Sequence, residues 1–431
     1  MSSSIIESTY PLSFRQKDAL VLGEHIKNGH SVVLVGMKRV GISNFLRFFL
    51  YHKDISKTYI NDGKNHLFIP IDLNDLVERE IYPFWVLTLK RIADTIATTS
   101  LSDNVKKHIE ILFIDSIQTQ DLFLTIDYVR KALLMLSEQN ILPTLFFLRF
   151  DRMKDSATDV FFDNLQGLLD ATHKRMSYVF TSVRTLDSLA PDVFPKSSVA
   201  VFAQNMYIKP ASKKDIEMIF QTNSKQCKLA IPKSLERLFL ESVDGYIQYL
   251  QYLLIFLSER KTLPKSDLEL FTNLVRDERI ALQSEELWES LNSAEQETLL
   301  KSVQGKKLSG EDKKRGEYLW DTGFITKIGT VFSPLFEFFL KEKLEEKSNE
   351  SQKVELSKKE NQLIKLLEER VDDICEREEI IEKVWPEMES FGVSDWAIDR
   401  LVARLRNKLK LQKSPYEIVT IKTRGYKLIK S

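Results

Sequence analysis

The segment Val32-Val-Leu-Val-Gly-Met-Lys-Arg-Val-Gly-Ile-Ser-Asn-Phe-Leu46 decides the fold of the amino-terminal part of the chain. It starts as an apolar run with the length of a buried strand and continues into a loop whose glycines, Gly36 and Gly41, are five positions apart. The apolar pattern after Gly41 indicates a helix. A strand, a glycine-rich loop and a helix in this order are the layout of a phosphate-binding loop.

Four further strands are predicted along the chain after this segment. Short runs of apolar, β-branched and aromatic residues alternate with helical periodicity at Ser31–Val35, Leu67–Asp72, Thr144–Phe150, Ser177–Val183 and Gln204–Ile208. Such alternation predicts a parallel sheet with helices on both faces. No strand signal appears from Ser212 to about Arg279, so that stretch is predicted to be an all-helical subdomain.

The loop has only part of the chemistry that a nucleotide needs. Gly36 and Gly41 would let backbone N–H groups turn toward an anion at the start of a helix. Ser43 stands where a hydroxyl holds Mg²⁺ in such loops. The lysine expected after Gly41 is replaced by Ile42, which cannot neutralise a phosphate.

A second element of the same site is predicted at the end of the strand Thr144–Phe150. Asp151 follows this strand in the position of the carboxylate that holds Mg²⁺. The next position, usually a glutamate that polarises the attacking water, is Arg152. Lys38 and Arg39 are the cations within the loop that could replace the missing lysine. Because both positioning and charge stabilisation are weakened, we expect nucleotide binding without efficient hydrolysis and assign no catalytic residue.

These motifs resemble the STAND and archaeal-type branch of the AAA-like ATPases. Lys38-Arg39-Val40-Gly41 follows the wording of that family's loop, and Asp244-Gly245-Tyr246 matches a motif within its lid. The resemblance covers Leu22 to about Lys343 as scattered short motifs. It implies a P-loop NTPase-like core at 1–210, a helical lid at 211–285, ATP or ADP with Mg²⁺ as ligand, and self-association controlled by that nucleotide. The nucleotide-binding candidates are Gly36, Lys38, Arg39, Gly41, Ser43 and Asp151.

Residues 286–343 are predicted to form a first winged helix. A capping box of Ser293 with Gln296 precedes an apolar helical stripe, and a glycine stop with a short hairpin near Thr330 follows. No basic helix is apparent in this unit, so a protein partner is an alternative to DNA here. The charged stretch Lys341–Lys353 predicts a helix end that frays into a linker at 344–355.

The last part of the chain, 356–431, predicts three helices and a hairpin. The first helix opens with a capping box of Ser357 and Glu360, and the second stops at Trp385-Pro386. The third runs from Ser394 to Lys410 and carries an apolar stripe at spacings of three, four and seven, formed by Ile398, Leu401, Val402, Leu405 and Leu409.

The opposite face of this third helix carries polar and basic side chains. Trp396, Arg400, Ala403 and Asn407 form it, with Arg404 beside them and Arg406 and Lys408 flanking it. Arg and Asn on the outer face of a buried helix are what a reader of the DNA major groove needs. The hairpin tip Thr423-Arg424-Gly425 would rest on a minor groove or on phosphates. From position 400 onward, ten basic residues stand against Glu417 alone, which favours contact with phosphates.

The order of these motifs resembles the OmpR/PhoB-type response-regulator effector domain. Leu-Ser-x-x-Glu, a second helix ending in Trp, Arg-Leu-Arg-x-Lys-Leu and a final Gly-Tyr-x-Leu all occur between 356 and 429. The resemblance implies double-stranded DNA bound by a dimer, recognition-helix roles for Arg404 and Arg406, and wing roles for Thr420 and Lys422. Thr423 replaces a family glycine near the wing tip. The DNA-binding candidates are Trp396, Arg400, Arg404, Arg406, Asn407, Lys408, Thr420, Lys422 and Arg424.

Composition limits the other function classes. The chain has 62 basic and 62 acidic residues, 43% hydrophobic residues and 29% charged residues, as expected of a globular protein with several domains. Two cysteines, Cys227 and Cys375, cannot build a disulfide framework and favour a cytoplasmic location. No apolar run is long enough to span a bilayer, and the six histidines lack metal-ligand spacing, so neither a membrane nor a metal site is expected.

The sequence therefore predicts a multidomain α/β plus α+β protein with a P-loop NTPase-like parallel sheet, a helical lid and two winged-helix domains. Its predicted function is DNA-binding transcription regulation, with a degenerate ATPase-like module that senses a ligand or self-associates. No receiver domain with a phosphoacceptor precedes the terminal domain, so the signal must enter elsewhere. Two alternatives stay open at this point. One is an active DNA-dependent ATPase of replication-initiator type, and the other is a scaffold whose winged helices contact proteins.

Overall fold

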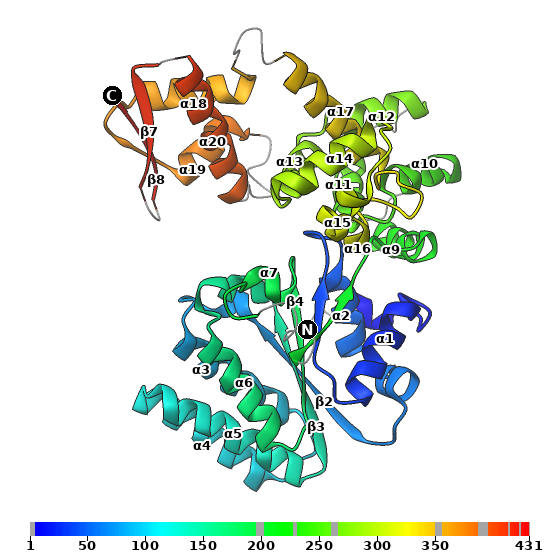
Figure 1. Ribbon diagram of the computed structural model, residues 1–431, viewed down its shortest axis with the longest axis vertical. Helices are drawn as coiled ribbons and strands as arrows, with labels where there is room; N and C mark the ends of the chain where they lie inside the picture. The colour runs from blue at the N-terminus through cyan, green and yellow to red at the C-terminus, as the bar shows by residue number, and fades with distance from the viewer. Residues whose placement is uncertain are drawn as a thin grey trace. The chain divides into compact units, whose positions relative to one another are not determined.

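The computed structural model describes residues 5–194, 202–226, 231–259, 266–349, 356–386, 395–412, 414–421 and 424–430. The chain forms two compact units, Met1–Phe339 and Leu340–Ser431, which are described separately (Figure 1). Within the described segments, no helix is both long enough and apolar enough to cross a bilayer.

The first unit is built on a parallel sheet of five strands. They are β1 (Val32–Val35), β2 (Asn65–Asp72), β3 (Ile141–Leu148), β4 (Ser177–Ser182) and β5 (Gln204–Tyr207), in the spatial order β2-β3-β4-β1-β5. Every neighbouring pair is parallel, with β1 between β4 and β5. All five predicted strands are confirmed. β3 ends earlier than predicted, so the strand does not run up to Asp151, which lies in the short 3-10 helix η4 (Phe150–Ser156).

Helices cover both faces of this sheet. Figure 1 shows α1 (Gln16–Lys27) and α2 (Ile42–Tyr51) on one side and α3 (Ile81–Ala97), α4 (Asp103–Thr119), α5 (Leu122–Glu138) and α6 (Asp159–Ala171) on the other. Shorter helical turns are η1 (Ile6–Thr9), η2 (Ser56–Ile60), η3 (Leu73–Asp75) and α7 (Leu186–Leu189). Aromatic side chains fill the interior between α3, α6 and the sheet, and Phe84, Trp85, Phe147, Phe161 and Phe180 are fully buried. This packing holds the strand ends, and the loops that follow them, in place.

The chain after β5 is helical, as predicted. The helices are α9 (Lys213–Gln226), α10 (Lys233–Val243), α11 (Ile247–Ser258), α12 (Asp267–Val275) and α13 (Glu278–Glu289). The described residues between 212 and 279 contain no strand. Gly245 connects α10 to α11 at a φ of +80°, and a Cβ there would lie 2.1 Å from the carbonyl oxygen of Ala211. Only glycine fits this turn, which fixes α11 against the segment after β5.

The small unit that follows contains α14 (Ser293–Val303), α15 (Gly310–Arg315), α16 (Glu317–Thr322) and α17 (Pro334–Asn349). The predicted capping box of Ser293 with Gln296 is wrong by one residue. Asn292 is the N-cap, and it exchanges hydrogen bonds with Glu295, because the helix begins at Ser293 itself. The predicted hairpin is reduced to one bridge between Ile325 and Val331.

The second unit contains the predicted helices and hairpin. These are α18 (Lys358–Glu368), α19 (Arg377–Val384), α20 (Asp395–Leu411), β7 (Tyr416–Ile421) and β8 (Gly425–Lys430). The capping box of Ser357 with Glu360 is confirmed. A short strand that the sequence did not predict, β6 (Ile374–Glu376), pairs with β8 and gives an antiparallel sheet in the order β6-β8-β7. Three helices on a small antiparallel sheet with a terminal hairpin form a winged-helix domain.

Candidate functional site

The loop between β1 and α2 is held in shape by its two glycines. Gly41 has a φ of +109°, and an added Cβ would lie 2.2 Å from Cδ1 of Ile247, the first residue of α11. At Gly36 an added Cβ would lie 2.9 Å from the carbonyl oxygen of Ile208 and 3.2 Å from Cδ1 of Ile42. The loop is therefore closely covered by α11, and the apolar side chain of Ile42 lies over it at the position of the missing lysine.

A cavity of about 440 Å³ opens beside this loop at the carboxyl ends of the strands. Ligands of doubly wound folds bind at this edge. The cavity is lined by all six nucleotide-binding candidates: Gly36, Lys38, Arg39, Gly41, Ser43 and Asp151. The fold thus brings together every residue that the sequence assigned to this site.

The two loop cations are paired with one carboxylate of helix α13. Glu286, on α13, lies 3.6 Å from Nζ of Lys38 and 3.2 Å from Nε of Arg39, and its side chain is only 13% exposed. The Tyr246 hydroxyl donates to the Lys38 carbonyl oxygen at 2.7 Å. The cations that could replace the missing lysine are therefore engaged by an anion of the protein itself.

The other two basic residues of the cavity are paired in the same way. Arg47 donates from Nε to the buried carboxylate of Glu7 at 2.8 Å, and the Asn44 amide donates to the same oxygen at 3.0 Å. Arg149 forms an ion pair with Asp72 at the end of β2. None of the three carboxylates that pair with these cations, Glu7, Asp72 and Glu286, lines the cavity. Each basic side chain of the phosphate-loop cavity thus has an internal counter-ion.

Asp151 lines the cavity from helix η4 and not from a strand end. Burial raises the pKa of its carboxyl, and the nearby cations Lys38, Arg152 and Arg149 only partly oppose this effect. A raised pKa favours the neutral acid, which is a poorer ligand for Mg²⁺ than the carboxylate. The backbone N–H of Arg149 donates to the Thr181 hydroxyl at 2.7 Å, which ties the start of this turn to β4.

The residue that follows β4 by two positions connects the core to the small helical unit. Arg184 donates from Nη1 and Nη2 to the two carboxylate oxygens of Glu295 at 2.7 and 2.8 Å, and its guanidinium lies 3.9 Å from the centre of the Tyr318 ring. Glu295 is also the N3 residue that caps α14. The segment directly after β4 therefore makes a buried ion pair with α14.

In the second unit, α20 packs on the rest of the domain through its apolar stripe. Ile398, Leu401, Val402, Leu405 and Leu409 are all buried, as predicted. Arg400 is half-buried. Trp396 and Asn407 lie within α20, but their side chains are outside the described part of the structure, as is Lys422 in the hairpin tip. The DNA-binding roles of these residues remain predictions.

Two basic side chains of α20 that are candidates for DNA binding lie near a carboxylate of α18. Glu360 is buried, and it lies 2.7 Å from Nζ of Lys408 and 3.9 Å from Nε of Arg404. Burial opposes the ionisation of Glu360, but the hydrogen bonds from Lys408 and from the Ser357 backbone outweigh it and lower the pKa of the carboxyl. Lys408 and Arg404 thus anchor α20 to α18, whatever they contact outside the domain.

Two further candidates contact each other. Arg406 donates from Nε to the carbonyl oxygen of Ile418 and from Nη2 to the Thr420 hydroxyl, both at 2.8 Å. These bonds tie α20 to β7 and set the position of the hairpin. In the hairpin tip, Arg424 lies 3.2 Å from the Glu376 carboxylate, and its side chain is more than half exposed.

Arg377 was not identified from the sequence. It donates to the Asp395 carboxylate at 3.1 Å and to the Asp399 carboxylate at 2.6 Å, and Asp399 also accepts from the Tyr426 hydroxyl. Arg377 therefore holds the start of α20 against α19 and β8. Its position directly after the unpredicted strand β6 gave no sequence signal for this role.

Comparison with known families identifies the second unit. Residues 351–428 match the family described as "Transcriptional regulatory protein, C terminal". Transcriptional regulatory protein YxdJ of Bacillus subtilis is 34% identical over 79 residues, which are 18% of this chain and 34% of that protein. The cholera toxin homolog transcriptional activator of Vibrio parahaemolyticus is 32% identical over 109 residues, which are 24% of this chain and 37% of that protein. The chain thus spans about a third of the length of the curated relatives that it matches.

Solved structures that are similar to this chain are more distant in sequence. The Walker-type ATPase paby2304 of Pyrococcus abyssi has a TM-score of 0.48 at 14% identity, covering 78% of this chain and 99% of that one. The Aeropyrum pernix ORC2 protein has a TM-score of 0.47 at 13% identity, covering 95% of this chain and 98% of that one. Similarities of this extent carry no information on activity.

Proposed function

We propose that this protein regulates transcription by binding double-stranded DNA through its carboxyl-terminal winged helix. The observation that carries this proposal is that the family match, 351–428, coincides with a domain whose third helix, α20, buries one apolar face. Both curated relatives bear names of transcriptional regulators. A helix fixed on one side and basic on the other suits insertion into a major groove.

The contacts of α20 support the same function, because they hold the helix before any DNA arrives. Glu360 on α18, Arg377 on α19 and the carbonyl oxygen of Ile418 on β7 each bind a side chain of α20. A recognition helix that is fixed in the free protein loses little entropy on binding. We assign base or phosphate contacts to Arg400, and also to Trp396 and Asn407, which the helical spacing of the sequence predicts on the same face.

The amino-terminal module is proposed to sense a ligand or to self-associate, and not to turn over ATP efficiently. The six candidate residues around the phosphate loop would cradle ATP or ADP. Ile42 and the pairing of Lys38 and Arg39 with Glu286 leave little free positive charge for the β- and γ-phosphates. Calorimetric titration of the full chain with ATP and Mg²⁺ tests binding, and a turnover assay with and without DNA tests hydrolysis. DNA-stimulated turnover that is abolished by Asp151→Ala would favour an active ATPase instead.

The DNA-binding proposal is tested by selecting bound duplexes from a random pool with the full chain. The affinity for the selected duplex is then measured for the unchanged protein, for Arg400→Ala and for Arg237→Ala. We expect Arg400→Ala to weaken binding about tenfold, as for the loss of one specific contact. Arg237→Ala is the matched control, because its side chain is 83% exposed and it lies in the other unit. A pool from which no sequence is enriched, or equal affinities for all three proteins, contradicts the proposal.

A further inference from the structure

A second cavity, of about 580 Å³, lies at the amino-terminal edge of the parallel sheet. Four connections form its walls: the residues after α1, those before β2, those between α5 and β3, and those between α6 and β4. The phosphate loop follows β1 and so lies at the opposite edge. A cavity of this volume is within the usual range for small-molecule sites, about 300–1,000 Å³.

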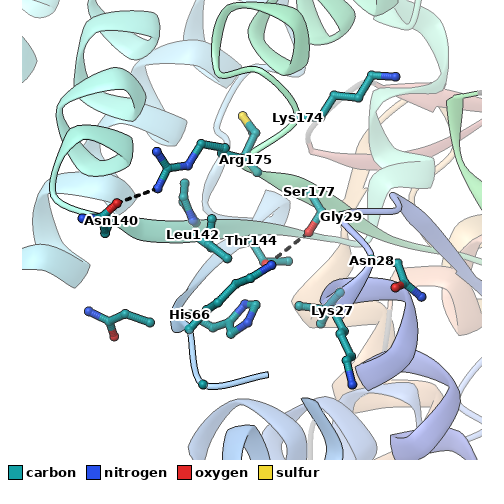
Figure 2. Close-up of a pocket in the computed structure, with 16 residues that line it drawn as sticks. Lys27, Asn28, Gly29, His66, Asn140, Leu142, Thr144, Lys174, Arg175 and Ser177 are labelled. Atoms are coloured by element: carbon teal, nitrogen blue, oxygen red, sulfur yellow. Dashed lines mark hydrogen bonds between the residues drawn. The ribbon is translucent and has the colours of Figure 1, made fainter. Parts of the chain in front are cut away.

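The charge of this cavity differs from that of the phosphate-loop cavity. Its lining includes Lys27, Lys64, Lys174 and Arg175 but no Asp or Glu (Figure 2). Only Lys64 has a carboxylate near it, Asp62 at 3.9 Å, among the residues that the structure describes. Arg175 donates to the neutral amide oxygen of Asn140 at 3.1 Å. Lys27, Lys174 and Arg175 therefore have no carboxylate within 4.0 Å among the described residues.

The most buried polar side chains of the lining are two hydroxyls, which we call the floor of the cavity. The hydroxyls of Thr144 and Ser177, on β3 and β4, lie 3.2 Å apart, and both residues are more than nine-tenths buried. When one hydroxyl donates to the other, the second keeps a proton that still needs an acceptor. The dashed line between them in Figure 2 marks this bond.

His66 supplies an unpartnered polar atom at the same place. Its side chain is 2% exposed, and Nε2 lies 3.0 Å from both carboxylate oxygens of Asp62. Nδ1 is buried and has no hydrogen-bond partner. Because buried polar atoms are nearly always satisfied, a ligand group at Nδ1 would remove an unfavourable feature.

Helix ends explain part of this arrangement but not all of it. α1, α5 and α6 end beside the cavity, and cations are favourable near helix carboxyl termini. That effect accounts for Lys27 at the end of α1 and for Lys174 after α6. It does not account for the unpartnered Nδ1 of His66 or for the hydroxyl pair on the floor.

We propose that this cavity binds a small phosphorylated molecule that carries hydroxyl groups, such as a sugar phosphate. Lys27, Lys174 and Arg175 would hold the phosphate, and His66 with the Thr144–Ser177 pair would bind the hydroxyls. This site is separate from the phosphate loop, and it would give the amino-terminal module a second ligand input. The inference rests on the first unit alone and does not depend on DNA binding.

The test is calorimetric titration of the full chain with ribose 5-phosphate, inorganic phosphate and ribose. We expect ribose 5-phosphate to bind more tightly than inorganic phosphate and ribose not to bind. The double variant Lys27→Ala/Lys174→Ala should lower the affinity for ribose 5-phosphate at least about tenfold, since it removes two charge-assisted contacts. Lys38→Ala/Arg39→Ala removes the same charge at the phosphate loop and should leave this affinity unchanged. Both altered lysines around the cavity are exposed, so the fold should tolerate their loss.

A second readout follows the imidazole of His66 by nuclear magnetic resonance. Addition of ribose 5-phosphate should shift the Nδ1 signal in the unchanged protein and in Lys38→Ala/Arg39→Ala. Three results would overturn the proposal. The first is that ribose 5-phosphate does not bind at concentrations up to about 10 mM, which is above the range of ordinary metabolite affinities. The second is that Lys38→Ala/Arg39→Ala loses the binding. The third is that ribose 5-phosphate binds without any change in the His66 signal.

Discussion

The Glu286 carboxylate of α13 lies 3.2 Å from Nε of Arg39, so an acidic residue of the protein pairs with the loop that the sequence marks for phosphate. The two residues are 247 positions apart in the chain. An anionic ligand at the loop would have to compete with Glu286 for Arg39 and for Lys38. This relationship makes the position of α13 part of any nucleotide binding at the site.

Replacing Glu286 by Gln should raise the affinity for ADP. The variant keeps the shape of the side chain but removes the charge that holds Lys38 and Arg39. We expect a gain of several-fold and up to about tenfold, because both cations are partly exposed and solvent screens their pairing. Calorimetric titration measures the affinity for ADP, and Glu289→Gln on the same helix serves as the control. An unchanged affinity would show that these cations do not contact the nucleotide.

Gly41→Ala should destabilise the first unit. The new Cβ would clash with Ile247, and the alanine would have to adopt a backbone φ of +109°. We therefore expect a loss of about 2 kcal/mol or more in the free energy of unfolding. Gly167→Ala in α6 is the matched control, because its Cβ would enter open space. In the middle of a helix this second change should be neutral or stabilising by up to about 1 kcal/mol. Denaturant unfolding of both variants measures the difference, and equal stabilities would contradict the close approach of α11.

Arg184→Lys should not replace the arginine. Lysine cannot make the bidentate bond to Glu295 or stack on Tyr318, and it would leave a buried carboxylate poorly paired. We expect a loss of about 3 kcal/mol in unfolding free energy, as for a broken buried ion pair. The surface pair Arg237–Glu241 offers the contrast, and Arg237→Lys should leave the unfolding midpoint unchanged. A midpoint for Arg184→Lys equal to that of the unchanged protein would mean that the bidentate bond to Glu295 and the stacking on Tyr318 add nothing to stability.

The stability of α18 should fall in acid, and Glu360 should be one cause. Because the folded domain lowers the pKa of Glu360 below the ordinary value of about 4.3, its contribution is present above that pH and is lost as the pH falls through the folded-state pKa. Amide hydrogen exchange of α18 in the full chain measures this effect. The amides of α18 should exchange faster in Glu360→Gln than in the unchanged protein at pH 7. The difference between the two exchange rates should become smaller toward pH 3. A gap that stays constant over this range would contradict the ionic role of Glu360.

Arg406→Ala should loosen the hairpin as well as weaken DNA binding. Its bonds to the Ile418 carbonyl oxygen and to Thr420 hold β7 against α20. Faster amide exchange in β7 and weaker binding to the selected duplex should therefore appear together. Weaker binding with unchanged exchange would instead indicate that Arg406 contacts the DNA directly, as the family resemblance implies.

Local patterns predicted most of the architecture. Each of the five parallel strands was an apolar run between helical stretches, and the stripe of α20 was readable from its spacing of three and four. The capping box at Ser293 was placed one residue late, because Asn292 and Glu295 offer the same chemistry one position earlier. β6 was missed, since a strand of three residues has too few positions to show an alternating pattern.

The amino-acid sequence by itself determined the two-glycine loop, the missing lysine at Ile42 and the basic stretch from position 400 onward, because each is a feature of neighbouring residues. Tertiary structure alone decided where the charges go. Glu7, Asp72 and Glu286 lie 40 to 248 positions from the cations that they neutralise, whereas Lys27 and Lys174 meet at a cavity without a carboxylate. Ion pairing depends on distances of a few ångströms between elements, and a pattern along the chain carries no information on which elements will come that close.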